Sequence, residues 1–452
     1  MKWGSKTKLT ILVLLTYSIV LLAAGNIFAQ EPNSEQIELI KEQIKQELLM
    51  ELRGEEPPAS EPLSPEWSQV KEQIKKELKQ EILVEGDVPK PQPTEGKDFR
   101  TQVRDAVLES LGGEDSAMGK FMSRFEFGML LEFGAVFEKT EFNDGSKEDR
   151  SAFAMTTVEL AIAVELADWA NGEVVLLYED PTFDDETSLD VDVAALTIGN
   201  TEKFPAYLTA GAFYVPFGAL YTHFPDDPLI DAPLTLLLGE SREKAVLAGV
   251  EHAGFSLSGY VFNGDVDKAG DDDDHIENFG FDANYTWESE EEGGLAITVG
   301  ASYINNITES DNITDSLNRP ELEDRPGGFD AYLHAEFAGF FALAEYMASL
   351  ESWEPVDEED QLLQGKKPAV WNFEAGYNWN WWRNLEIALK YAGSNDAGGL
   401  GFPEYRFGID FNQELYDGLV VSLGYLYDKY HDDDVDDREH RNMVFSQLSF
   451  EF

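Results

Sequence analysis

The chain has 452 residues, of which 33 are Lys or Arg and 88 are Asp or Glu, so its formal net charge is −55 and its isoelectric point is about 4.2. Such an acidic chain repels polyanions, which excludes a nucleic-acid-binding protein. It contains no Cys, which excludes disulfide frameworks, thiolate metal sites, cysteine nucleophiles and the lipid-modified cysteine of a bacterial lipoprotein.

The first residues have the pattern of an export signal. Lys2, Lys6 and Lys8 carry positive charge, and an apolar stretch over 9–25 follows them. Small residues then lead to Ala29, the preferred cleavage position. We therefore predict a signal peptide over 1–29 and an exported chain; the alternative is an anchor helix that is retained.

Residues 30–115 differ in composition from the rest of the chain. They are rich in Glu, Lys and Gln, poor in aromatic residues and interrupted by prolines, which separate short helices. Apolar residues recur every four positions in three segments, the first two of which form an internal repeat: Ile40, Ile44, Leu48 and Leu52; Val70, Ile74, Leu78 and Ile82; Val103, Val107 and Leu111. We predict a periplasmic helical, coiled-coil extension whose apolar stripe meets another helix; a solvated spacer is the alternative.

From residue 120 onward the apolar period changes to two. Along 125–137 every second residue is apolar, while Glu126 and Glu132 fall on the opposite face of the strand. The alternation recurs in about sixteen segments. The fold class predicted for 120–452 is therefore an all-β transmembrane barrel of about 16 antiparallel strands; a soluble sandwich is the alternative.

The connections between these segments tend to alternate in length. Short ones such as 253–254 and 338–339 are interspersed with long polar ones such as 305–327 and 351–367. Short periplasmic turns and long surface loops are typical of outer-membrane barrels. The final strand ends at Phe452 and resembles the signal that such barrels present to the barrel assembly machinery. We therefore expect the barrel to lie in the bacterial outer membrane, with its extension in the periplasm and lipopolysaccharide around its loops.

Sixteen strands leave a water-filled lumen, so passage of small solutes is the expected function. The connection after the fifth segment, 219–243, is unusually apolar for a surface loop, and apolar loops need cover. We predict that it folds into the lumen and narrows it; the alternative is a structural lid across the mouth of the barrel. The residues predicted to line the constriction are Tyr221, Asp226, Asp227, Asp231, Glu240 and Glu243.

A distinctive run of residues surrounds the start of this loop. It comprises Phe213, Tyr214, Val215, Pro216, Phe217, Gly218, Tyr221, Thr222, Asp227, Pro228, Leu229, Leu238, Gly239 and Glu240. This pattern resembles the motif of the LbtU-type siderophore porins, with Ser241 in a place where the family pattern has Thr. The resemblance also covers the helical extension and the barrel. It implies uptake of a ferric siderophore without a plug domain, and porin precedent suggests a homotrimer.

The predicted inward positions are strongly acidic. The residues predicted to line the lumen are Glu126, Glu132, Glu159, Asp282, Asp330, His334, Glu336, Glu374, Lys390 and Arg406. Carboxylates along a pore attract cations and exclude anions, so a general or cation-preferring diffusion porin is an alternative to siderophore uptake. An oxyanion-selective porin is a further alternative, which the same charge disfavours.

Other functions have weaker support in the sequence. Acidic runs at 271–274 and 432–437 supply oxygen ligands for Ca²⁺ or Mg²⁺ but lack the EF-hand spacing, so we expect loose binding at most, with no metal site and no cofactor. His334 lies near Asp330 and Glu336 without a nucleophile motif, so we do not predict an enzyme. A barrel that tethers the outer membrane through its helical extension is a remaining alternative.

Overall fold

The computed structural model describes residues 123–451, apart from 180–182, 184–187, 221–230, 267–274, 290–292, 317–321, 356–362, 380–383 and 417. Residues 1–122 and Phe452 fall outside the described residues. The signal peptide, the helical extension and the assembly signal at Phe452 therefore stay predictions. No helix in the described part of the chain is long and apolar enough to cross a membrane.

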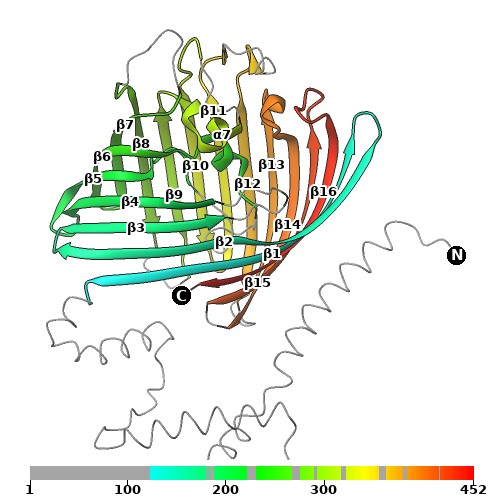
Figure 1. The fold of residues 1–452 in the computed structure, drawn as a ribbon. Coiled ribbons are helices and arrows are strands. Elements are labelled where there is room, and N and C mark those ends of the chain that lie inside the picture. The colour runs from blue at the N-terminus through cyan, green and yellow to red at the C-terminus, as the bar shows by residue number, and fades with distance from the viewer. Residues whose placement is uncertain are drawn as a thin grey trace, which may run out of the picture. The chain divides into compact units, whose positions relative to one another are not determined.

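The described chain forms one closed antiparallel barrel of sixteen strands, as the alternation predicts (Figure 1). The strands are β1 (Phe125–Phe142), β2 (Lys147–Ala167), β3 (Ala170–Glu179), β4 (Ser188–Asn200), β5 (Phe204–Tyr214), β6 (Arg242–His252), β7 (Phe255–Phe262), β8 (Asn278–Glu288), β9 (Ala296–Ile304), β10 (Gly328–Phe337), β11 (Phe340–Ser349), β12 (Ala369–Trp379), β13 (Leu385–Asn395), β14 (Pro403–Tyr416), β15 (Leu419–Tyr430) and β16 (Arg438–Glu451). Each strand pairs with its neighbours in the sequence, and β1 pairs with β16.

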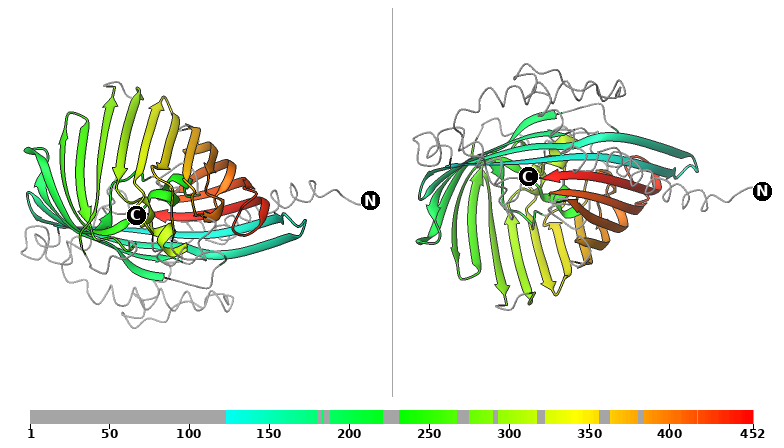
Figure 2. Two further views of the ribbon diagram at one scale, coloured as in Figure 1. Left: turned by 90° about the horizontal axis from the view of Figure 1, so that it is seen from above. Right: turned by 90° about the horizontal axis from the view of Figure 1, so that it is seen from below.

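Four short helical segments have bounds within the described residues of the connections. They are α6 (Leu234–Gly239), η1 (Ile307–Glu309), α7 (Asp311–Ser316) and η3 (Gly398–Leu400). Viewed along the barrel, α6 and α7 lie inside the ring of strands (Figure 2). The loops that carry these two helices therefore reach into the interior.

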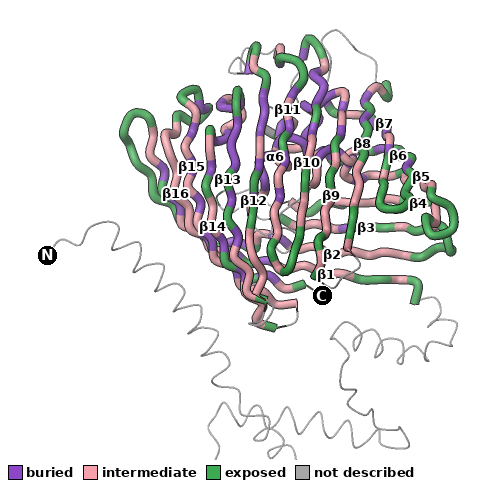
Figure 3. The backbone as a smooth tube through the Cα atoms, turned by 180° about the vertical axis from the view of Figure 1, so that it is seen from behind, coloured by how far each residue is buried: buried purple, intermediate pink, exposed green. Residues whose placement is uncertain are grey.

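Alternate residues of each strand face opposite sides of a wall that is one sheet thick. On β12, Phe373 is 47 % exposed, whereas the next residue, Glu374, is 2 % exposed. On β13, Leu389 is 56 % exposed and Lys390 only 3 %. Figure 3 shows this alternation of exposed and buried residues along the strands. The exposed apolar residues form the outer, lipid-facing surface, and the charged residues face inward.

The connections define two different rims. Ala253–Gly254 and Ala338–Gly339 are two-residue turns in which both residues have positive φ, at 50° and 84° and at 50° and 86°. Such turns match the twist of the paired strands and need Gly at one of the two positions. They lie on the same rim as the start of β1 and the end of β16, which we call the short-turn rim. The connections 215–241, 263–277, 305–327 and 350–368 begin and end at the opposite rim, which we call the long-loop rim.

Candidate functional site

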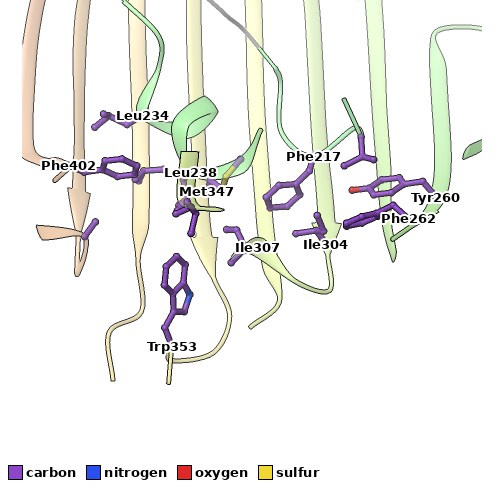
Figure 4. Close-up of a cluster of buried hydrophobic side chains, with 14 of the residues drawn as sticks. Phe217, Leu234, Leu238, Tyr260, Phe262, Ile304, Ile307, Met347, Trp353 and Phe402 are labelled. Carbon is purple, nitrogen blue, oxygen red and sulfur yellow. The ribbon is translucent and has the colours of Figure 1, made fainter. Parts of the chain in front are cut away.

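We call the connection between β5 and β6, residues 215–241, the constriction loop; its described parts, 215–220 and 231–241, lie inside the barrel. Its helix α6 contacts the inner sides of β11, β12 and β13. Leu234 and Leu238 on this helix are 1 % and 0 % exposed. Figure 4 shows these two side chains among Phe217, Met347 and Phe402. Packing against the wall removes the apolar side chains of the loop from water.

A single carboxylate, Glu345 on β11, holds the two arms of the constriction loop. The backbone N–H of Ala219 donates to Glu345 Oε1 at 2.7 Å, and the hydroxyl of Thr235 donates to Glu345 Oε2. On the neighbouring wall, the backbone N–H of Gly218 donates to Ser302 Oγ at 2.8 Å. Glu345 is only 6 % exposed, so these bonds lie away from bulk water. They fix the path of the loop where it leaves β5 and again where it enters α6.

The conformation at the start of the constriction loop depends on the apolar residues Val215 and Phe217 and on Gly218. Val215 and Phe217 are 0 % and 1 % exposed and pack in the core between the loop and the wall. Gly218 has φ of +89°, and a Cβ atom there would lie 2.9 Å from Met347 Cε and 3.0 Å from Glu345 Oε1. A larger residue would therefore be strained and would push against the anchoring carboxylate. The motif over 213–218 is the structural base of the loop.

The middle of the loop is bound to the wall through Asp231. Lys390 Nζ donates to the backbone oxygen of Asp231 at 2.9 Å and lies 3.4 Å from its Oδ2. Arg406 Nη1 donates to the same Oδ2 at 2.8 Å. Both bases also pair with wall carboxylates, Lys390 with Glu374 at 3.3 Å and Arg406 with Asp428 at 2.7 Å. The loop thus crosses from β5 to the β13 and β14 side of the lumen.

A second connection, between β9 and β10, supports the end of the constriction loop. The backbone N–H of Asp311 donates to the Glu240 carbonyl oxygen at 2.8 Å, and the backbone N–H of Arg242 donates to the Asp311 carboxylate at 3.1 Å. Glu309 accepts from the backbone N–H groups of Asp265 and Val266, at 2.7 and 3.2 Å. Three connections on the long-loop rim are therefore joined through two carboxylates.

The environment of these two carboxylates disfavours their charged forms. Burial raises the pKa of Glu309 to about 7, against the opposing effect of the backbone N–H groups that it accepts. Burial also raises the pKa of Asp311 to about 7, although the Arg242 N–H and guanidinium oppose the shift. Both groups therefore change protonation state close to neutral pH.

The inner wall carries more buried acid than buried base. The register places Asp282, Ser302 and Asp330 side by side across β8, β9 and β10, and the two aspartates are 5 % and 0 % exposed. On the other side of the lumen, Arg441 Nη2 lies 2.6 Å from Asp428 Oδ2, and its Nη1 lies 3.2 Å from Glu138 Oε2. Arg441 is therefore matched by two acids of the wall.

The structure distributes the sequence-predicted residues unevenly. Tyr221, Asp226, Asp227, Pro228 and Leu229 fall outside the described residues. Asp231 anchors the loop, and Glu240 joins it to Asp311. Glu243 was predicted in the loop but lies on β6, because Arg242 and Glu243 already pair with Tyr214 and Phe213 on β5.

The predicted lumen residues also divide into groups. Asp282, Asp330, Glu374, Lys390 and Arg406 are buried on the inner wall, and the last three hold or surround Asp231. Glu132 is 0 % exposed and accepts from Gln447 and Ser449, so it belongs to the closing seam of the barrel. Glu126 is exposed and Glu159 is half-buried. His334 lies 3.4 Å from Glu336, toward the short-turn end of β10.

Sequence reasoning missed Glu345, Asp428 and Arg441. Glu345 and Asp428 alternate with outward-facing aromatic residues such as Tyr346 and Tyr427, a pattern that indicates an inward position, whereas Arg441 lies between His440 and Asn442 and has no such signal. The acidic run over 432–437 is engaged by bases, since Asp433 pairs with Lys366 at 2.6 Å and Asp434 with Arg438 at 2.9 Å. Within the described ranges, no three His, Asp or Glu residues come together as a metal-binding group.

Comparison with known proteins places the fold among the porins. No family model matches the chain. A UPF0422 protein of Coxiella burnetii is 24 % identical over 343 residues, covering 74 % of this chain and 71 % of the relative. A UPF0422 protein of Legionella pneumophila strain Paris is 23 % identical over 289 residues, covering 60 % of this chain. The chain matches about half the length of that relative, 53 %.

Solved structures give the class of the barrel. OprB of Pseudomonas putida is similar with a TM-score of 0.51 and 11 % identity, over 75 % of this chain and 97 % of OprB. The outer-membrane channel DcaP of Acinetobacter baumannii has a TM-score of 0.49 and 15 % identity, over 73 % of this chain and 97 % of DcaP. The closed barrel of sixteen antiparallel strands and its similarity to OprB therefore show a porin-like fold. Its similarity in sequence is to UPF0422 proteins.

We predict that Glu345→Ala releases the constriction loop. The substitution leaves the Ala219 N–H and the Thr235 hydroxyl without their acceptor, and each buried unpaired group costs about 1–3 kcal/mol. Single-channel recordings in planar bilayers should show a larger and noisier conductance. Glu345→Gln keeps an acceptor oxygen and should give an intermediate result. Equal conductance and noise in all three proteins would contradict this anchoring role.

We predict that the support of the loop weakens as the pH rises toward about 7. A carboxyl whose pKa is raised in the docked loop binds its proton more tightly there than in the released loop. The protonated carboxyl therefore favours docking, and this contribution is complete at a pH below the ordinary pKa of a carboxyl. It is lost as the pH rises through the raised pKa. Hydrogen exchange of 305–316 should be slower at about pH 5 than at about pH 9. Asp311→Asn should reduce the difference; an exchange rate that falls with pH, after correction for intrinsic chemistry, would refute the mechanism.

Proposed function

We propose that the protein is a passive channel of the outer membrane through which small hydrophilic solutes pass, with a preference for cations. The observation that carries this proposal is the constriction loop bound inside the barrel at Glu345, Lys390 and Arg406. A loop fixed inside the barrel narrows the path that a solute would take through the lumen.

The preference for cations rests on the fixed charges of the lumen. The bases Lys390, Arg406 and Arg441 each contact at least one carboxylate, so they contribute little net positive field. Exposed and half-buried acids such as Glu126 and Glu159 add negative charge on the β1 and β2 side. A wall of this sign concentrates cations in the pore and repels anions.

Planar bilayers under a KCl gradient test the charge preference. We expect a reversal potential that reports a higher permeability for K⁺ than for Cl⁻. Combining Glu126→Gln with Glu159→Gln should lower the permeability ratio by a factor of about two, because both acids face the lumen. Glu202→Gln, in the turn between β4 and β5, is the control and should leave the ratio unchanged. Anion selectivity in the parent protein would overturn the proposal.

Uptake of a ferric siderophore is a second candidate function. It is favoured by the motif over 213–218, which resembles the LbtU-type siderophore porins and forms the base of the constriction loop. The acidic wall opposes it for an anionic siderophore, because like charges repel at close range.

Growth under iron limitation separates the two functions. If the second candidate is correct, a deletion strain supplied with a purified ferric siderophore should grow more slowly, and the intact gene should restore growth. Unchanged growth together with lower permeability for small sugars would eliminate siderophore uptake and support the diffusion channel.

A further inference from the structure

A cavity of about 910 Å³ lies on the outer surface of the barrel at the short-turn rim. Its walls come from the start of β1, the turn between β2 and β3, and the turn between β4 and β5. Its floor residues Leu166, Ile198 and Leu208 lie on the outward phase of their strands, and none of the described residues of the constriction loop lines it. The channel function makes no use of it.

The floor of the cavity is apolar and faces lipid. Leu166, Ile198 and Leu208 lie here and are 50 %, 46 % and 43 % exposed. Trp169 and Phe204 flank the floor and are 62 % and 68 % exposed. Large aromatic side chains at the end of a lipid-facing band are typical of the membrane interface, where an apolar body meets a polar layer.

The edge of the same cavity is basic. Arg124 donates one guanidinium N–H to the Leu166 carbonyl oxygen at 3.4 Å, which leaves most of its five donors for other partners. Lys203 is 3.4 Å from Asp168, and both side chains are largely exposed, at 65 % and 81 %. The Asn200 amide donates to the Asp168 carbonyl oxygen at 2.7 Å, which orders the turn next to Lys203. The cavity thus has two bases and one acid, in a chain whose net charge is −55.

We propose that this cavity binds an anionic phospholipid of the periplasmic leaflet. The phosphate would lie between Arg124 and Lys203, and the acyl chains would run along Leu166, Ile198 and Leu208 toward the bilayer centre. Three observations support this occupant. The short-turn rim is the periplasmic end of such barrels. The basic edge is complementary to a phosphate, and the apolar floor continues directly into the lipid-facing band.

Lipid retention tests the proposal on the full-length protein. The purified chain is incubated with equal amounts of dioleoyl phosphatidylglycerol and dioleoyl phosphatidylcholine, and bound lipid is measured by native mass spectrometry. We expect selective retention of phosphatidylglycerol, and a loss of roughly tenfold in the variant that combines Arg124→Ala with Lys203→Ala. Combining Lys139→Ala with Lys147→Ala removes the same charge from the long-loop rim and should change nothing. Equal retention of both lipids, or no loss in the first variant, would overturn the proposal.

A second measurement identifies what occupies the cavity. Because the chain has no Cys, Phe204→Cys gives one position for a fluorescent label in the cavity wall. Brominated phosphatidylglycerol should quench this label more strongly than brominated phosphatidylcholine, and Arg124→Ala should remove the difference. A label that neither lipid quenches would show that lipid does not occupy the cavity and would reject the lipid site.

Discussion

The structure depends on the pairing of β1 with β16, which closes the barrel. In a bilayer no water is present to bind a free strand edge, so a sheet can span the membrane only when its first and last strands pair. The pairing runs from Leu130↔Glu451 to Phe142↔Arg438, with one irregularity at its long-loop end. On the inner side of this seam Glu132 is fully buried and accepts hydrogen bonds from Gln447 and Ser449. The bonds across the seam join the two ends of the barrel and satisfy a carboxylate that would otherwise oppose closure.

Closure creates an interior, and the constriction loop divides it. The loop combines apolar packing around Leu234 and Leu238 with polar anchors at Glu345 and Asp231. Apolar packing supplies the free energy that holds the loop against the wall, but it is non-directional and specifies the position of the loop only loosely. Hydrogen bonds and ion pairs have strict geometry and define that position more closely. A buried ion pair adds little net stability over an apolar contact, but loss of one partner leaves a buried charge unpaired. The anchors are therefore best understood as fixing where the loop lies in the lumen.

The sequence predicted the fold more completely than the site, for a physical reason. A one-residue slip in register would turn the apolar face of a strand toward the lumen. The alternation along β12 and β13 therefore indicates both that these segments are strands and which of their residues face outward. The partners of Asp231 are 159 and 175 residues away, and only the curvature of the closed barrel brings them together. Glu243 was assigned to the loop because a charged residue at a strand end carries no signal of pairing. Glu345 had the correct phase, but its role depends on a loop that approaches from another part of the chain.

The placement of the few basic residues explains how the protein manages its large negative charge. Inside the barrel, Lys390 and Arg406 lie where wall carboxylates and Asp231 converge, and a base there offsets the repulsion that would otherwise expel the loop. Because Lys390 and Arg406 are paired with carboxylates of the protein, their positive charges are not available to attract an anionic solute. At the outer short-turn rim, Arg124 and Lys203 are exposed with a single acid beside them. The same residue types therefore have two roles: inside the barrel they offset the protein's own negative charge, and at the short-turn rim they remain largely exposed.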